Sequence, residues 1–328
     1  MNVLVTGASG FLGSHVAEQL ARAGHHVRAL VRPTSDVDFL QTLPGLEFVV
    51  GAVDEPATLA EAVAGADGIV HAAGLIKARS AREFHRCNAD GTENVLAAAR
   101  AHAPGLARFV LVSSQAATAP SADGAPVAND VEPRPLTDYG RSKLAAERSA
   151  RAHAAHLPVT IVRPPMTYGP RDRSTFPLFA AVARRVAPSL GDPDGKVSLV
   201  YAPDCARACA LALTADVPSG SAYFVTDGRV YTRRELLAGL EQAVGRRALV
   251  TAPLPARLVR AAALASEAYG RLTGRPVLFD RQKLDELLGQ WVCDGSEAER
   301  ALGFRAEVDW FEGARRAARW YREQGWLS

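Results

Sequence analysis

The feature that most constrains the fold is a group of three glycines between an apolar run and an Ala-rich stretch near the N-terminus. Residues 3–13 read VLVTGASGFLG, with the spacing Gly-x-x-Gly-x-x-Gly. A pyrophosphate can bind backbone N–H groups at a helix N-terminus when no side chain blocks its approach. The segment therefore predicts a strand, a dinucleotide-binding turn and a helix. The candidate binding residues in it are Gly7, Ser9, Gly10, Phe11, Leu12 and Gly13.

Short apolar runs alternate with Ala-rich stretches through the first half of the chain. Strands are expected at residues 3–6, 26–31, 68–71, 109–113 and 159–163, and helices at 11–23, 82–101 and 139–153. This alternation is typical of a parallel sheet with helices on both faces. After residue 170 the pattern is less regular. Further helices are expected at residues 176–186, 204–214, 232–244, 257–272 and 310–324.

The predicted fold class is α/β, with a Rossmann-type doubly wound parallel sheet and a smaller, mainly helical C-terminal lobe. Residues 1–165 are expected to form an NAD(P)-binding domain, to which segments of about 190–225 return. Residues 166–328 are expected to form a substrate-binding lobe that closes over the carboxyl edge of the sheet.

Charge and cysteine usage argue against several classes of protein. The net charge is only +3, and positive residues alternate with Asp and Glu, so nucleic-acid binding has no support. No stretch approaches the ~18 uninterrupted apolar residues of a membrane span. The first strand begins too early to leave room for a signal peptide, which predicts a cytoplasmic protein. The four cysteines are scattered, so no metal site is predicted.

The chain has a basic residue near the position that distinguishes NAD(H) from NADP(H) in dinucleotide-binding proteins. About twenty residues after the glycines, NAD-binding proteins carry an acid that binds the ribose 2′-hydroxyl. This chain has Val31 followed by Arg32. Because an Arg attracts a 2′-phosphate that an acid would repel, NADP(H) is favoured over NAD(H). The alternative is that Arg32 is only a solvated residue at a strand end.

Tyr139 and Lys143 are four residues apart, so on a helix they share one face. A nearby ammonium, together with the helix N-terminus, is expected to draw the pKa of the phenol from ~10 toward neutrality. The phenol could then exchange a proton with a substrate oxygen while hydride moves. Ser114 ends the strand at 109–113 and could donate a hydrogen bond to the same oxygen. The predicted catalytic residues are Ser114, Tyr139 and Lys143.

Together these residues resemble the extended short-chain dehydrogenase/reductases of the NAD-dependent epimerase/dehydratase superfamily. The segments that carry the resemblance are residues 6–13, 71–74, 88–94, 113–114, 139–143 and 163–170. The resemblance implies that Ala73 and Gly74 line the nicotinamide ribose and that Pro165 contacts the carboxamide. Val53, Asn88, Tyr139 and Lys143 are further cofactor-binding candidates. Val31 and Arg32 look like the NADP-dependent dihydroflavonol-reductase type.

Several positions depart from the nucleotide-sugar branch of that group. Family members commonly carry Asp at the position of Ala52, where it reads the adenine. Sugar dehydratases carry an Asp-Glu pair where Gln115 and Ala116 stand, and nucleotide-sugar enzymes tend to have an Arg before the late strand that this chain lacks. The closing part of the chain resembles the 3β-hydroxysteroid dehydrogenase-like branch. The resemblance implies an apolar alcohol or ketone as the substrate, on analogy of fold.

Three functions stay open at this stage. The first is interconversion of a secondary alcohol and a ketone on an apolar, steroid-like or long-chain substrate. The second is a nucleotide-sugar epimerase with tightly bound NAD, and the third is a non-catalytic redox sensor.

Three smaller expectations concern one residue, one helix and the assembly. Lys77 could touch substrate or cofactor. The helix at 257–272 is expected to pack on the core; the alternatives are a wall of the substrate pocket or a peripheral membrane contact. A homodimer is expected through the helices at 82–101 and 139–153.

Overall fold

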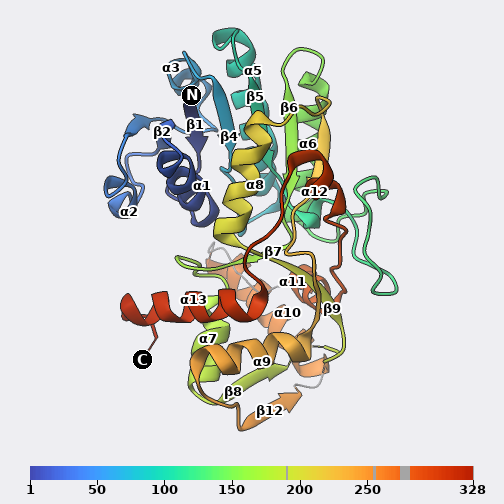
Figure 1. Ribbon diagram of the computed structural model, residues 1–328. Helices are drawn as coiled ribbons and strands as arrows, with labels where there is room; N and C mark the ends of the chain where they lie inside the picture. The colour runs from blue at the N-terminus through green and yellow to red at the C-terminus, as the bar shows by residue number, and fades with distance from the viewer. Residues whose placement is uncertain (190, 254–255, 274–280, 328) are drawn as a thin grey trace.

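A seven-stranded sheet forms the larger part of the protein, in a computed structural model that describes residues 1–189, 191–253, 256–273 and 281–327 (Figure 1). The strands are all parallel, in the order β10-β6-β5-β4-β1-β2-β3. Their bounds are β1 Asn2–Thr6, β2 His26–Val31, β3 Leu46–Val50, β4 Gly68–His71, β5 Arg108–Val112, β6 Val159–Arg163 and β10 Ser221–Phe224. The chain runs outward in one direction from β1 and in the other from β4, so the strand order reverses between these two strands.

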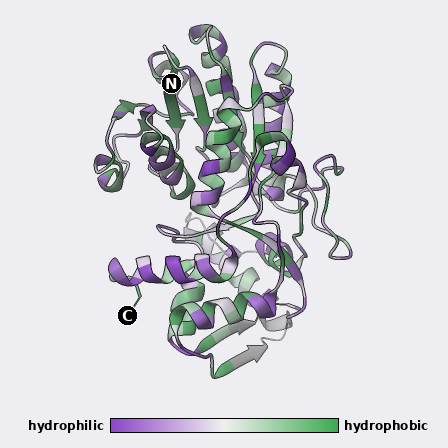
Figure 2. Cartoon of the chain, viewed as in Figure 1, coloured by the Kyte–Doolittle hydropathy of each residue, from purple (hydrophilic) through white to green (hydrophobic). Residues whose placement is uncertain are grey.

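Helices cover both faces of this sheet, as the alternation of elements predicts. One face packs on α1 and α8, and the other on α3, α5 and α6. Their bounds are α1 Phe11–Arg22, α3 Leu59–Val63, α5 Gly91–His102, α6 Asp138–His153 and α8 Ala202–Thr214. Side chains alternate accordingly along β1, where Val3 and Val5 face α1 and Leu4 faces the other side. Figure 2 shows the resulting apolar strands in the centre of the sheet.

A second core lies below the sheet in Figure 1. It is built around Tyr168 and Trp310, whose rings meet edge to face with centroids 4.7 Å apart. Its elements are β7 Met166–Tyr168, α7 Phe176–Ala183, β9 Lys196–Tyr201, β11 Val230–Thr232, α9 Arg233–Val244 and α13 Trp310–Glu323. The two-stranded sheet β8 (Val186–Ser189) and β12 (Val250–Pro253) lies beside them. Among the described residues, no helix is both long and apolar enough to cross a bilayer.

The structure departs from the sequence-based expectations in three places. The strand β3 was not expected; it forms the edge of the sheet, where Phe48 and Val50 are exposed and Val49 is buried. The single helix expected at 82–101 is instead α4 (Ala81–Phe84), a π-helical turn (His85–Asp90) and α5. The C-terminal half holds several short strands as well as helices. The division into domains at residue 165 stays a prediction, although α8 and β10 do pack on the large sheet.

Candidate active site

The turn after β1 lies where the strand order reverses, which is the position at which sheets of this kind bind dinucleotides. Gly7 adopts φ +71°, and a Cβ there would lie 2.6 Å from the backbone nitrogen of Ala73, at the end of β4. A Cβ on Gly13 would lie 2.0 Å from the Gly7 carbonyl oxygen. Only glycine fits either position, so the turn, β4 and α1 pack backbone against backbone.

The N-terminus of α1 is open to a ligand. Gly10 caps this helix without a side-chain hydrogen bond, and Ser9 and Gly10 are exposed. Phe11 and Leu12 in the first turn are partly buried. The first N–H groups of the helix therefore point toward a space that no side chain of the cap fills, which fits a pyrophosphate.

Two further cofactor candidates lie on the β2–β3 side of this turn. Arg32 is exposed at the end of β2, and no ion pair of its guanidinium is found within the described ranges. Val53 is buried, and its carbonyl accepts a hydrogen bond of 2.9 Å from the Asn94 amide. The Arg32 side chain is thus exposed to solvent, and Val53 is held by α5.

Ser114 and Tyr139 are brought together from different elements. Ser114 follows β5, and its hydroxyl accepts a hydrogen bond from the Ala116 backbone N–H at 3.1 Å, which starts a short 3-10 turn. Tyr139 lies in the first turn of α6, which Thr137 caps by accepting the Gly140 N–H at 3.0 Å. The Ser114 side chain lies near enough to the Tyr139 phenol to lower its pKa. A substrate oxygen placed at this pair would meet two hydroxyl groups.

Lys143 lies one turn after Tyr139 and is buried. Its ammonium donates a hydrogen bond of 2.7 Å to the Val112 carbonyl at the end of β5. Burial lowers its pKa to about 8, against the opposing effect of the Glu147 carboxylate. A Cβ on Gly74 would lie 3.9 Å from this ammonium. Lys143 is therefore positioned at the ends of β4 and β5.

Asn88 connects three parts of this site. Its side-chain oxygen accepts the Leu75 N–H at 2.7 Å, and its amide nitrogen donates to the Leu75 carbonyl at 3.0 Å and to the Ser142 hydroxyl at 2.9 Å. Asn88 belongs to the π-helical turn, a feature that often marks functional sites. The residue thereby holds the segment after Gly74 against α6. Pro165, the remaining candidate, is buried just after β6.

The expected lowering of the Tyr139 pKa is not found. Burial raises the pKa of this phenol to about 12; the Ser114 side chain lowers it, and the nearby Glu286 carboxylate raises it. The prediction from spacing was wrong for the cofactor-free protein because the Lys143 ammonium bonds the Val112 carbonyl while the phenol loses water. The phenol is thus protonated at neutral pH.

A buried ion pair fixes α6 to the sheet. Glu147, one turn beyond Lys143, accepts hydrogen bonds of 2.6 and 2.8 Å from Arg163 at the end of β6. It also accepts one of 2.6 Å from the Ser113 hydroxyl. The Arg163 guanidinium donates a further bond of 2.7 Å to the Asn129 carbonyl. Both charged groups have several partners, so helix α6 has a fixed register beside β5 and β6.

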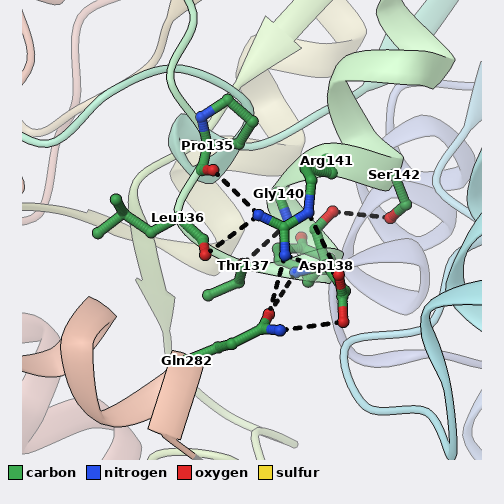
Figure 3. Close-up of polar contacts among 9 residues, drawn as sticks. Pro135, Leu136, Thr137, Asp138, Gly140, Arg141, Ser142 and Gln282 are labelled. Carbon is green, nitrogen blue, oxygen red and sulfur yellow. Dashed lines mark hydrogen bonds and ion pairs between the residues drawn. The ribbon is translucent and has the colours of Figure 1, made fainter.

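Helix α11 (Arg281–Leu288) docks on the start of α6 (Figure 3). The Gln282 side-chain oxygen accepts the Asp138 backbone N–H at 2.7 Å, and its nitrogen donates to the Asp138 carboxylate at 3.1 Å. Arg141 donates to the same carboxylate at 2.7 Å and to Gln282 at 3.3 Å. These contacts bring α11 beside Tyr139, the residue that follows Asp138.

A pocket with polar and apolar walls opens at Tyr139. Its lining residues are Ile76, Lys77, Ala78, Phe84, Thr137, Asp138, Tyr139, Gln282, Lys283 and Glu286. The Phe84 ring lies 6.1 Å from the Tyr139 ring, centroid to centroid. Lys77 thus lines the pocket at Tyr139, and its contact with substrate or cofactor stays a prediction. Within the described ranges, no cluster of His, Cys, Asp and Glu could hold a metal ion.

This geometry agrees with comparisons to known proteins. The model of the NAD dependent epimerase/dehydratase family matches residues 3–225, more than half of the chain. The chain belongs to this family. It is therefore an NAD(P)-dependent enzyme of the extended short-chain dehydrogenase/reductase type, as the resemblance implied, and the reading as a non-catalytic sensor loses its support. The matched range includes the glycine turn, Ser114, Tyr139 and Lys143.

Three reductases are similar to this chain along nearly their whole length. Ceramide reductase of Caulobacter vibrioides is 35% identical, over 99% of this chain and 96% of the relative. The 2-alkyl-3-oxoalkanoate reductase of Stenotrophomonas maltophilia is 33% identical, over 96% and 98%. The 4-hydroxy-2-methyl-3-oxo-4-farnesyl-3,4-dihydroquinoline-1-oxide ketoreductase of Stigmatella aurantiaca is 33% identical, over 95% and 94%.

Solved structures of the same family also superpose along the chain. The crystal structure of gox2253 has a TM-score of 0.82 and 28% identity, with 99% of both chains covered. The structure of MoeE5 in complex with UDP-glucuronic acid and NAD has a TM-score of 0.78 and 25% identity, covering 99% of this chain and 100% of the other. The Rossmann-type fold class is confirmed.

Sequence reasoning missed the residues around the predicted pair. Glu147 could have been found, because it continues the i, i+4 spacing of Tyr139 and Lys143. Gln282 and Glu286 gave no such signal, since they are more than a hundred residues from α6 and only the folded chain brings them there.

Proposed function

We propose that this enzyme is an NADP(H)-dependent ketoreductase that converts a ketone on a long-chain apolar substrate into a secondary alcohol. The observation that carries the proposal is the convergence of Ser114 after β5 and Tyr139 in the first turn of α6, with the buried Lys143 ammonium one helical turn further on, at the end of β5. A bound nicotinamide supplies the hydride. The roles that follow belong to the residues of this chain.

Tyr139 is the proton donor in this proposal. Its pKa of about 12 keeps the phenol protonated at neutral pH, which is the state that a ketone needs when its oxygen gains charge. Ser114 donates a hydrogen bond to the same oxygen and thus orients it. Lys143, whose buried ammonium is held by the Val112 carbonyl, offers further N–H donors to the ribose.

The proposed substrate class rests on the relatives and on the pocket. Ceramide, a 2-alkyl-3-oxoalkanoate and a farnesyl-bearing quinoline each carry long hydrocarbon groups, and the three relatives are named as reductases. Ile76 and Phe84 give the pocket at Tyr139 apolar walls. Gln115 and Ala116 replace the acidic pair of sugar dehydratases, which argues against dehydration. The chain also lacks the Arg before the late strand that nucleotide-sugar enzymes tend to have, which disfavours the epimerase alternative.

Chain-length dependence tests the proposed substrate class. In a series of 3-oxo amides and esters with growing alkyl chains, kcat/KM measured from NADPH consumption should rise by up to about fourfold per methylene while the pocket still buries it. UDP-glucose serves as the control substrate. A flat series, or conversion of UDP-glucose without net use of NADPH, would contradict the proposal.

The choice of NADP(H) is proposed from Arg32. Replacing Arg32 with Ala should raise the Kd of NADPH about ten- to a hundredfold through loss of a charge-assisted contact with the 2′-phosphate, and leave that of NADH nearly unchanged. Fluorescence titration with both dinucleotides measures this. Arg22→Ala, on an exposed side chain of α1, is the matched control. Equal losses for both dinucleotides would show that Arg32 does not read the phosphate.

We infer an NAD(P)-binding domain of residues 1–165, joined by α8 and β10, and a substrate lobe made of the rest. We also propose a homodimer through the helices at 82–101 and 139–153, the assembly that the resemblance implies.

A further inference from the structure

Helix α10 (Ala256–Thr273) presents an apolar stripe to solvent. The stripe consists of Ala261, Leu264, Ala265, Ala268, Tyr269 and Leu272, all of which are exposed. Its three large members are 49%, 52% and 88% exposed. The spacing i, i+3, i+4, i+7, i+8, i+11 places all six on one face.

The opposite face of α10 is the one that packs on the protein. Ala263 is fully buried and clusters with Leu284 and Leu288 of α11. Figure 1 shows α10 and α11 as neighbours below the large sheet. Helix α10 is thus packed on α11 through one face, and the exposed stripe is formed by its other face.

The charges around the stripe favour an anionic partner. The sequence of α10 contains three arginines and a single acid, Glu267. Glu267 is partly buried and its carboxylate pairs with Arg281 at 3.0 Å, so its charge is neutralised away from the stripe. Arg260 is exposed at the border of the stripe. An apolar face with a cation at its border is the pattern of a helix that lies in a membrane interface.

We propose that α10 docks this enzyme on the surface of a bilayer that contains anionic lipids. Leu264, Tyr269 and Leu272 would enter the interface between headgroups and chains, and Arg260 would meet lipid phosphates. The inference deepens the proposed function, because a long-chain ketone resides in membranes.

The position of α10 connects such a surface to the site. Its buried face packs on α11, and α11 contributes Gln282, Lys283 and Glu286 to the pocket at Tyr139. Docking of α10 would therefore place the wall of the pocket close to the lipid from which a long-chain ketone has to come. A substrate could then reach Tyr139 without crossing bulk water.

Sedimentation with vesicles tests the docking without any substrate. Wild-type enzyme should bind vesicles of phosphatidylcholine containing phosphatidylglycerol, more weakly when salt is raised. The double variant Leu264→Asp and Leu272→Asp should lose about tenfold or more of this binding. Val230→Asp changes an exposed valine of β11 in the same way and should bind like wild type.

Two further readouts separate the alternatives. Turnover of a short, water-soluble ketone should be the same in the double variant and wild type, so that reading tests the reductase proposal alone. Light scattering reports the oligomeric state. The docking proposal is overturned if wild type ignores anionic vesicles, if the double variant binds them equally well, or if it turns a dimer into monomers, which would make the stripe a contact between copies. Stripe-dependent binding without ketone turnover would sustain the docking and refute the reductase.

Discussion

Replacing Tyr139 with Phe is expected to lower kcat for ketone reduction by about a hundred- to ten-thousandfold, the usual contribution of a positioned general acid. The ring and its contact with Phe84 remain, and only the phenolic hydroxyl near Ser114 is lost. The Kd of NADPH should change by no more than about tenfold, the worth of one hydrogen bond. Steady-state kinetics and a fluorescence titration measure the two quantities.

A second tyrosine provides the control for this variant. Tyr223 is buried in β10, away from the site, and Tyr223→Phe should keep wild-type kcat. If Tyr139→Phe kept more than about a tenth of the activity, the proton would have to come from another group, and the assigned role of the phenol would be wrong.

Removal of the Glu147 carboxylate should give the largest loss of stability. Glu147→Ala leaves the Arg163 guanidinium buried without its partner, which is expected to cost about 3–5 kcal/mol in the free energy of unfolding. Urea denaturation of the cofactor-free enzyme measures the change. Arg151→Ala removes the half-exposed partner of the same carboxylate and should cost less than about 1 kcal/mol. Equal effects of the two variants would show that the buried pair does not hold α6.

The Glu147 carboxylate also makes the stability of the folded enzyme depend on pH in the acidic range. Burial opposes ionisation of Glu147, but hydrogen bonds and charge from Arg163 hold its pKa below the ordinary value. A lowered pKa in the folded state means that the stability is present above the unfolded-state pKa and is lost as pH falls through the folded one. Glu147→Gln should flatten this acid limb of the stability curve.

The fold was predictable from local patterns because its central elements carry their own signals. β1, the glycine turn and α1 follow from eleven consecutive residues, and β2, β4 and β6 from apolar runs with the bounds found in the structure. β3 escaped because an edge strand needs no continuous apolar run. The π-helical turn escaped because one extra residue in a helix, here around Asn88, leaves the apolar pattern almost unchanged.

Part of the candidate site was predictable from the sequence, and part depends on the tertiary fold. Spacing alone places Tyr139 and Lys143 on one helix face, and the strand end at Ser114 lies at the same edge of the sheet. The raised pKa of the phenol could not be foreseen, since it depends on burial and on Glu286, which the tertiary fold brings near. The hydrogen bonds between Gln282 and Asp138 could not be foreseen either, since they join residues 144 apart in sequence.

Transfer of deuterium from NADPH that carries deuterium at both C4 positions of the dihydronicotinamide tests the central claim most directly. The enzyme is incubated with a long-chain 3-oxo amide, and the product is analysed by mass spectrometry and NMR. The account predicts one deuterium on the new carbinol carbon, with one NADP⁺ formed per alcohol. A product without deuterium, or a nucleotide sugar epimerised while NADPH stays unchanged, would contradict it.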